Sequence, residues 1–216
     1  MGTVIKILLV ICVIYLLMIL CENKENLYHI ALSCVNRREF ASVPTNPTLL
    51  TSINKVLGKN IRNKYQYTFI DFGSGFGTLL EQMRHKYVKL IGVELEKVSH
   101  EEATLKLRMY ENIVLENKPM EEFVFPDEDI ILYMYEPLFL LNDCSKRREI
   151  YNQVIGNLAK YSEKTYVIYI QSNRISHFQK GCDFDFNIFT NHGFRLINHS
   201  TSNLWPLSRS FYLFGR

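Results

Sequence analysis

The chain has 216 residues, of which 47% are hydrophobic and 22% charged, a composition typical of one globular domain with its own core. Its net charge is only +3 and it has no long run of Lys or Arg, so it carries no strong nucleic-acid signal. Its five cysteines form no C-x-x-C pair and its six histidines are dispersed, which argues against a zinc site and a disulfide framework. We therefore expect no bound metal.

Residues 3–21 are almost wholly apolar, and charged Glu22 follows them at once. With Lys6 snorkelling, the run reaches about nineteen residues, close to the roughly twenty that span a bilayer. A cleaved secretory signal and a buried core helix are the competing interpretations, but no small-x-small cleavage site follows the apolar run. We expect residues 1–21 to form a hydrophobic anchor or signal-anchor helix, followed by a linker over residues 22–43.

The charges beside this apolar segment slightly favour a cytosolic position for the rest of the chain. Lys6 and the amino terminus lie on one side, whereas Lys24, Arg37 and Arg38 follow on the other. Basic residues tend to remain on the cytosolic side of a membrane. The sequence therefore predicts a single-pass membrane protein whose folded domain faces the cytosol.

The folded domain is expected over residues 44–216, and its first element is a helix. Pro47 suits the first helical position, Asn46 can cap the helix, and Gly58 is expected to end it. The apolar residues of this segment recur at helical spacing: Leu49, Leu50, Ile53, Val56 and Leu57.

A predicted strand over residues 67–72 leads into a turn with three glycines, which reads Asp71-Phe-Gly-Ser-Gly-Phe-Gly77. Glycines allow the backbone to turn tightly and to approach a ligand closely. A helix over residues 78–86 and a strand over 88–95 are expected next, and Glu94 near the end of that strand can accept hydrogen bonds from both hydroxyls of a ribose. This order predicts a site for a nucleotide-type cofactor; the alternative is a generic βαβ turn that binds nothing.

The spacing of the glycines distinguishes between cofactors. A dinucleotide fingerprint reads G-x-G-x-x-G, whereas this turn reads G-x-G-x-G and is preceded by Asp71. A carboxylate at that position would repel a pyrophosphate but suits a cofactor with an ammonium group. S-adenosylmethionine (SAM) has such a group and no phosphate.

This stretch resembles the first motif of the class I, seven-strand SAM-dependent methyltransferases, D-x-G-x-G-x-G, at every fixed position. The resemblance implies an α/β fold: a Rossmann-like, doubly wound sheet that is mostly parallel and ends in an antiparallel hairpin. It also implies that SAM is the cofactor. The residues that it assigns to cofactor binding are Asp71, Gly73, Ser74, Gly75, Gly77 and Glu94.

A helix over residues 101–111 and a third strand over 113–116 are expected after Glu94. The resemblance places an acidic or amide residue beside the adenine directly after that third strand. Here the position falls near Asn117 or Lys118. Because Lys118 cannot accept a hydrogen bond, Asn117 is the candidate.

The predicted strand over residues 129–135 ends in Tyr135-Glu136-Pro137. Ligands of an open parallel sheet lie outside the carboxyl ends of its strands, so Tyr135 and Glu136 are expected to face the reacting methyl group. The resemblance makes this the motif that meets the substrate, where amino-methyltransferases carry Asn/Asp-Pro-Pro-Tyr/Phe. A carboxylate can accept a proton or hydrogen bond from an amine, so both residues are candidates for catalysis; the alternative is that Glu136 only contacts the cofactor or caps a helix.

The remaining elements complete the expected sheet. We expect a helix over residues 145–161, a strand over 165–171 and two final strands over 189–197 and 210–214. The only tryptophan, Trp205, lies between these last strands.

Three short elements, Val43-Pro44-Thr45, the glycine motif and Gly92-Val-Glu-Leu95, resemble mitochondrial protein-lysine methyltransferases with an N-terminal hydrophobic segment. The non-SET histone-lysine methyltransferases share the last two. The likeness ends after residue 96. It implies methyl transfer to a protein lysine and a location at a membrane, which includes a mitochondrial membrane. The alternatives are a nucleic-acid or small-molecule methyltransferase, or a non-catalytic binding module tethered to a membrane.

Overall fold

The computed structural model describes residues 47–138, 141, 143–161, 164–172, 185–202 and 209–216. The expected anchor helix and linker, the Asn46 cap and the Trp205 loop lie outside these residues. Within the described ranges, no helix has both the length and the apolar character that crossing a membrane requires.

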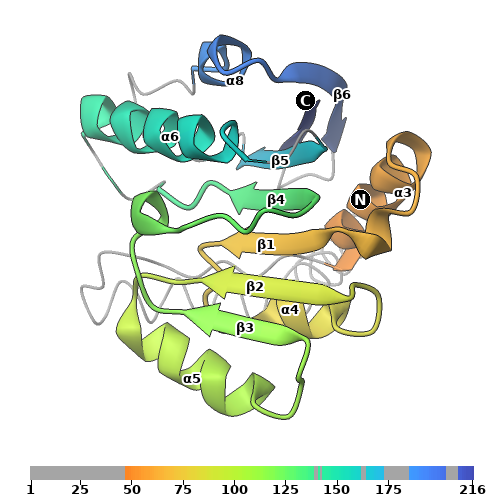
Figure 1. The fold of residues 1–216 in the computed structure, drawn as a ribbon, viewed down its shortest axis with the longest axis vertical. Helices are drawn as coiled ribbons and strands as arrows, with labels where there is room; N and C mark the ends of the chain where they lie inside the picture. Colours follow the sequence, from red (N-terminus) through yellow and green to blue (C-terminus); the bar gives the residue numbers. More distant parts are fainter. Residues whose placement is uncertain (1–46, 139–140, 142, 162–163, 173–184, 203–208) are drawn as a thin grey trace, which may run out of the picture. The chain divides into compact units, whose positions relative to one another are not determined.

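The described strands form one seven-stranded sheet in the order β3-β2-β1-β4-β5-β7-β6 (Figure 1). The strands are β1 (Thr68–Phe72), β2 (Lys89–Val93), β3 (Ile113–Glu116), β4 (Ile130–Tyr135), β5 (Thr165–Ser172), β6 (Arg195–Ser202) and β7 (Arg209–Gly215). Pairing is parallel from β3 through β5, while β7 runs antiparallel to both β5 and β6. The expected doubly wound sheet with a C-terminal antiparallel hairpin is confirmed.

Helices cover both faces of this sheet, and each face buries its own apolar cluster. One cluster contains side chains of α3 (Pro47–Asn60), α4 (Thr78–Met83) and the end of α5 (Lys97–Leu107). The other contains side chains of α6 (Cys144–Leu158) and α8 (Asn187–Asn191). We call these the α3 face and the α6 face. The side chains of successive strand residues point alternately to these two faces. The neighbours of a residue at a strand end therefore depend on the face to which its side chain points.

Two short 3₁₀ helices, η1 (Lys64–Gln66) and η2 (Met120–Glu122), lie in the connections. Lys64 of η1 is buried and donates from Nζ to the Asn54 carbonyl of α3 over 2.6 Å. Together with the Asn60 side chain, which donates to Val56 O, it satisfies carbonyls near the end of the helix. These bonds explain why α3 continues past Gly58, where we expected it to end.

Three other expectations from the sequence are wrong. Helix α5 begins at Lys97 rather than at residue 101, because the Glu96 carboxylate caps it and accepts from the N–H groups of Val98 and Ser99. The first part of the expected strand over 189–197 is instead the end of α8, and β6 begins only at Arg195. Cys144 is disulfide-bonded, although the spacing of the cysteines argued against a disulfide framework.

Candidate functional site

The glycine turn joins β1 to α4 at the carboxyl edge of the sheet. Gly73, Gly75 and Gly77 have φ values of +77°, +52° and +69°, a region that favours glycine. The N–H of Gly73 donates to Val93 O over 2.9 Å, which fastens the turn to the end of β2. A Cβ on Gly77 would lie 2.5 Å from Leu107 Cδ1, so this glycine is also required by the close packing of α5.

Two buried carboxyl groups lie beside this turn. Asp71 in β1 is 3% exposed and Glu94 after β2 is 8% exposed. Glu94 accepts hydrogen bonds from the N–H groups of Gly75, over 2.7 Å, and Glu96, over 2.8 Å. These bonds bring the Glu94 carboxylate to the middle of the glycine turn.

The shared burial of the two acids changes their ionisation. Burial, and secondarily the charge of Glu94, raises the pKa of Asp71 to about 8. Burial also raises the pKa of Glu94, although the N–H donors of Glu96 and Gly75 oppose the rise. A cation placed between the two groups would relieve both effects, because it favours the ionised carboxylates.

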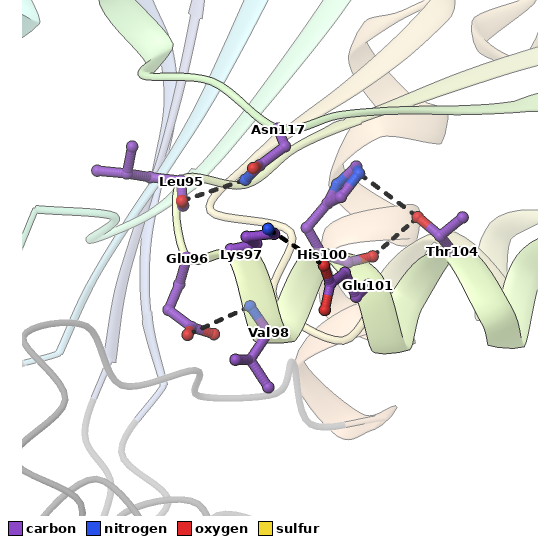
Figure 2. A network of polar contacts seen from close by, with 8 residues as sticks. All are labelled: Leu95, Glu96, Lys97, Val98, His100, Glu101, Thr104 and Asn117. Atoms are coloured by element: carbon purple, nitrogen blue, oxygen red, sulfur yellow. Dashed lines mark hydrogen bonds and ion pairs between the residues drawn. The ribbon is translucent and has the colours of Figure 1, made fainter.

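Asn117 links the ends of β2 and β3, as Figure 2 shows in part. Its amide nitrogen donates to Glu94 O over 2.7 Å and to Leu95 O over 3.1 Å. Lys118 instead pairs with Glu116, with Nζ 2.7 Å from Oε2. The structure thus places Asn117 directly beside Glu94, while the amine of Lys118 is held by its own ion pair.

Ser74 is the predicted cofactor residue whose side chain lies apart from the others. Its hydroxyl lies over Gly92 of β2, where an added Cβ would come within 2.9 Å of Ser74 Oγ. The hydroxyl is buried and has no hydrogen-bond partner among the described residues. Only the backbone of Ser74 takes part in the turn. Its N–H donates to Val93 O, and its carbonyl accepts from the N–H of Gly77.

Tyr135, the last residue of β4, packs against the apolar cluster of the α3 face. The guanidinium of Arg209 in β7 lies over its ring, with Cζ 5.1 Å from the ring centroid, and donates a hydrogen bond to its hydroxyl. Burial raises the pKa of Tyr135 to about 12, against the opposing charge of Arg209. The phenol is therefore neutral at physiological pH.

Glu136 follows at once, and its charge acts on the phenol of Tyr135 as well as on groups of the other face. It is 8% exposed and has a φ of +39°, which is unusual for a residue with a side chain. Its charge acts on two buried phenols of the α6 face, those of Tyr151 in α6 and Tyr169 in β5. The side chain of Tyr135 thus packs on the α3 face, while Glu136 lies within electrostatic range of phenols on both faces.

The two phenols hold the segment after β4 in place. The Tyr169 and Tyr151 hydroxyls are hydrogen bonded to each other, and the Leu138 N–H donates to the Tyr151 hydroxyl. Burial is the main cause that raises the pKa of both phenols. Sequence reasoning missed Tyr151, Tyr169 and Arg209; the apolar stripe of α6 could have identified Tyr151 as buried, but nothing local marks Arg209.

No group of three or more His, Cys, Asp or Glu side chains suited to a metal ion occurs among the residues that the structure describes. The groups gathered at the carboxyl edge are instead two acids, an amide, backbone N–H groups and one guanidinium. Such groups recognise an organic ligand with hydroxyls and charged ends.

No family model matches this sequence, and no curated protein does either. Solved structures do match. The N-methyltransferase NodS from Bradyrhizobium japonicum has a TM-score of 0.61 at 9% identity, over 79% of this chain and 97% of that one. A SAM-dependent methyltransferase from Clostridium acetobutylicum has a TM-score of 0.56 at 13% identity, over 75% and 89%. A segment of StiE described as an O-methyltransferase has 0.57 at 12%, over 78% and 74%.

At these identities the likeness shows the fold alone, which is that of SAM-dependent methyltransferases. NodS has also been solved with S-adenosylhomocysteine (SAH), and that structure matches with a TM-score of 0.61 at 12% identity, over 79% of this chain and 88% of that one. The matching proteins include both N- and O-methyltransferases by name. The fold is therefore compatible with more than one kind of methyl acceptor.

Proposed function

We propose that this chain is a SAM-dependent methyltransferase. The observation that carries the proposal is the buried pair Asp71 and Glu94 on either side of a glycine turn with three left-handed residues. A pair of acids without a buried cation between them is unfavourable, and a ligand with an ammonium and ribose hydroxyls would satisfy both. The chemistry of these groups therefore fits SAM.

Each residue of this half of the site has a role in binding. Glu94 would accept from the ribose hydroxyls, Asp71 would face the ammonium, and the Asn117 carbonyl oxygen would accept from the adenine amino group. The backbone of Gly73, Gly75 and Gly77 leaves room for the ligand to approach. When bound, SAM supplies an electrophilic methyl group on a sulfonium; the protein contributes alignment and electrostatics.

For the methyl acceptor we propose a protein lysine amine. Glu136 supports this assignment, because a buried carboxylate at the carboxyl end of β4 can accept a hydrogen bond or proton from an amine. Tyr135, on the α3 face, would orient the acceptor through its hydroxyl. A small-molecule or nucleic-acid acceptor, and a module that binds SAM without transfer, are the competing functions.

The apolar segment over residues 3–21 supports a membrane attachment, with the domain in the cytosol or at a mitochondrial membrane. Comparing the full chain with a chain that lacks residues 1–21 in flotation with liposomes tests this part. Equal recovery of both chains with the vesicles would overturn it.

Calorimetry with SAH tests the cofactor assignment directly. The full chain should bind SAH with a dissociation constant in the micromolar range, and Asp71→Ala and Gly75→Val should abolish binding. Glu128→Gln is a matched control, because Glu128 is an acid at the opposite end of the same strands, where it bonds to Thr68 and Lys89. A wild-type chain that binds neither SAM nor SAH would overturn the proposal.

Transfer of tritium-labelled methyl groups identifies the acceptor. With the full chain, labelled SAM and a cell lysate, label in protein bands supports the lysine assignment, provided that amino-acid analysis recovers methyllysine. Label in nucleic acid or in extractable material would support the alternative acceptors. Bound SAH without any transfer would favour the non-catalytic module.

A further inference from the structure

Arg209 is a buried cation at the carboxyl edge of the sheet. It opens β7 and pairs in register with Ser172, whereas Tyr135, the last residue of β4, pairs with Ile170. Arg209 therefore lies beyond the end of β4, on the side where ligands of such sheets bind. Only 5% of the residue is exposed.

The direct contacts of this guanidinium include no carboxylate among the described residues. It lies over the Tyr135 ring and donates to the phenol hydroxyl, as described above. Its Nε is buried and has no hydrogen-bond partner within the described ranges, and no ion pair among those residues includes Arg209. The charge of Glu136 reaches the same phenol, but a buried cation without a direct ion pair is costly, and an anionic ligand that bonds to it would offset that cost.

The geometry of the pair defines the kind of ligand. Because the Tyr135 hydroxyl accepts from Arg209, its own hydrogen remains to be donated, so both groups present donors. Guanidinium N–H groups bind carboxylates in two-point fashion. Three buried acids also lie along this edge, Asp71 at β1, Glu94 after β2 and Glu136 after β4, whereas Arg209 lies beyond β4.

We propose that Arg209 and Tyr135 form a carboxylate-binding subsite on the α3 face of the site. This inference rests on the proposed function. If the carboxylate at Arg209 belongs to the cofactor, it is part of the aminoacyl end whose ammonium faces Asp71. Otherwise it belongs to a methyl acceptor that binds beside the cofactor. The shared chemistry is a carboxylate held by a guanidinium and a phenol. Two arms of one experiment distinguish its sources.

The first arm measures the affinity of the full chain for SAH and for decarboxylated SAH. If the carboxylate belongs to the cofactor, Arg209→Met weakens SAH about tenfold to a hundredfold, the usual loss for a charged hydrogen bond. The same substitution leaves the affinity for decarboxylated SAH unchanged. Arg209→Lys, which keeps the charge, recovers part of the loss and excludes simple misfolding.

The second arm uses acetate as the probe, with acetamide as its neutral counterpart, in the presence of saturating SAH. If the carboxylate belongs to the acceptor, acetate binds the wild-type chain saturably, acetamide does not, and Arg209→Met removes the acetate signal. Arg195→Met, a change to an exposed arginine of β6, should alter neither arm.

The outcomes separate this inference from the proposed function. If SAH binds equally well to wild-type and Arg209→Met chains and acetate shows no binding that depends on Arg209, the subsite is wrong although the cofactor assignment stands. If the wild-type chain binds no SAH, the proposed function fails, and acetate binding without SAH then decides whether Arg209 holds a carboxylate.

Discussion

The two halves of the carboxyl edge are built in different ways. Around β1 and β2, the glycine turn and Glu94 come from one short stretch of chain and are joined mainly by backbone hydrogen bonds. Around β4, Tyr135 and Glu136 depend on side chains from β7, α6 and β5. The first half can be encoded locally, whereas the second exists only once distant elements have packed.

Under the proposed function, this difference would separate cofactor binding from the choice of methyl acceptor. The β1–β2 half offers acids and backbone groups, which suit the nucleoside and ammonium of a cofactor. The β4 half offers a guanidinium, a buried carboxylate and three phenols, which can be exchanged for other groups without changing the turn. Four substitutions test whether the halves are separate, beginning with the largest expected effect.

Gly77→Ala should damage the β1–β2 half most. The alanine would have to adopt a φ of +69°, and its Cβ would lie 2.5 Å from Leu107 Cδ1. Strain and overpacking together should lower the free energy of unfolding by about 2–5 kcal/mol, as measured by urea denaturation. The affinity for SAH should fall more than tenfold. Gly58→Ala is the control: the new Cβ in α3 would lie 3.2 Å from Lys64 Nζ and contact no residue of the turn, so SAH binding should remain intact.

Asp71 should make both binding and stability depend on pH. Its pKa of about 8 in the free protein means that the carboxyl is mostly protonated at neutral pH, so SAH affinity rises as the pH approaches 8 and then levels. Because the folded-state pKa is raised, the associated stability is present below the unfolded pKa near 4 and is lost as the pH rises through 8. Asp71→Asn should remove both trends in calorimetry and in thermal melts; an unchanged pH profile would contradict this assignment.

Tyr151→Phe should affect the β4 half alone. It removes the hydroxyl that bonds to Tyr169 and to the Leu138 N–H, so unfolding should become easier by about 1–2 kcal/mol. SAH affinity should remain within about twofold of wild type, while labelled methyl transfer decreases because the segment with Glu136 loses its anchor. Equal losses in binding and transfer would show that the two halves are not separate.

Ser74→Ala should have the smallest effect. The hydroxyl lies over Gly92 and has no partner among the described residues, so its removal should change both stability and SAH affinity by less than about 1 kcal/mol. A large loss of SAH binding would show that the hydroxyl turns toward the ligand.

The β1–β2 half could be predicted from the sequence because its signals are local. Glycine spacing, a preceding acid and a carboxylate after the next strand together specify the turn, and the structure brings Asp71, Glu94 and Asn117 to it. The mostly parallel sheet with its C-terminal antiparallel hairpin followed from the same resemblance. What the motif could not convey is that the Ser74 side chain turns toward the sheet.

The β4 half could be predicted only in part. The chain leaves the strand at Glu136, whose φ of +39° breaks the alternation of β4, and no sequence pattern revealed where this carboxylate points. The partners on each face come from elements whose packing no local pattern reveals, and Arg209 is the clearest case. Helix α8 was missed for a related reason, since five residues carry too little periodicity to distinguish a helical turn from a strand.

The cap of α5 has a consequence for competition among nucleotides. The amino-terminal end of a helix normally attracts phosphate, but here the Glu96 carboxylate already occupies it (Figure 2). The neighbouring Glu94, whose Oε1 accepts from the Glu96 N–H, adds a second negative charge. If SAM binds as proposed, these two acids would repel the phosphate groups of competing nucleotides from the position of the ribose.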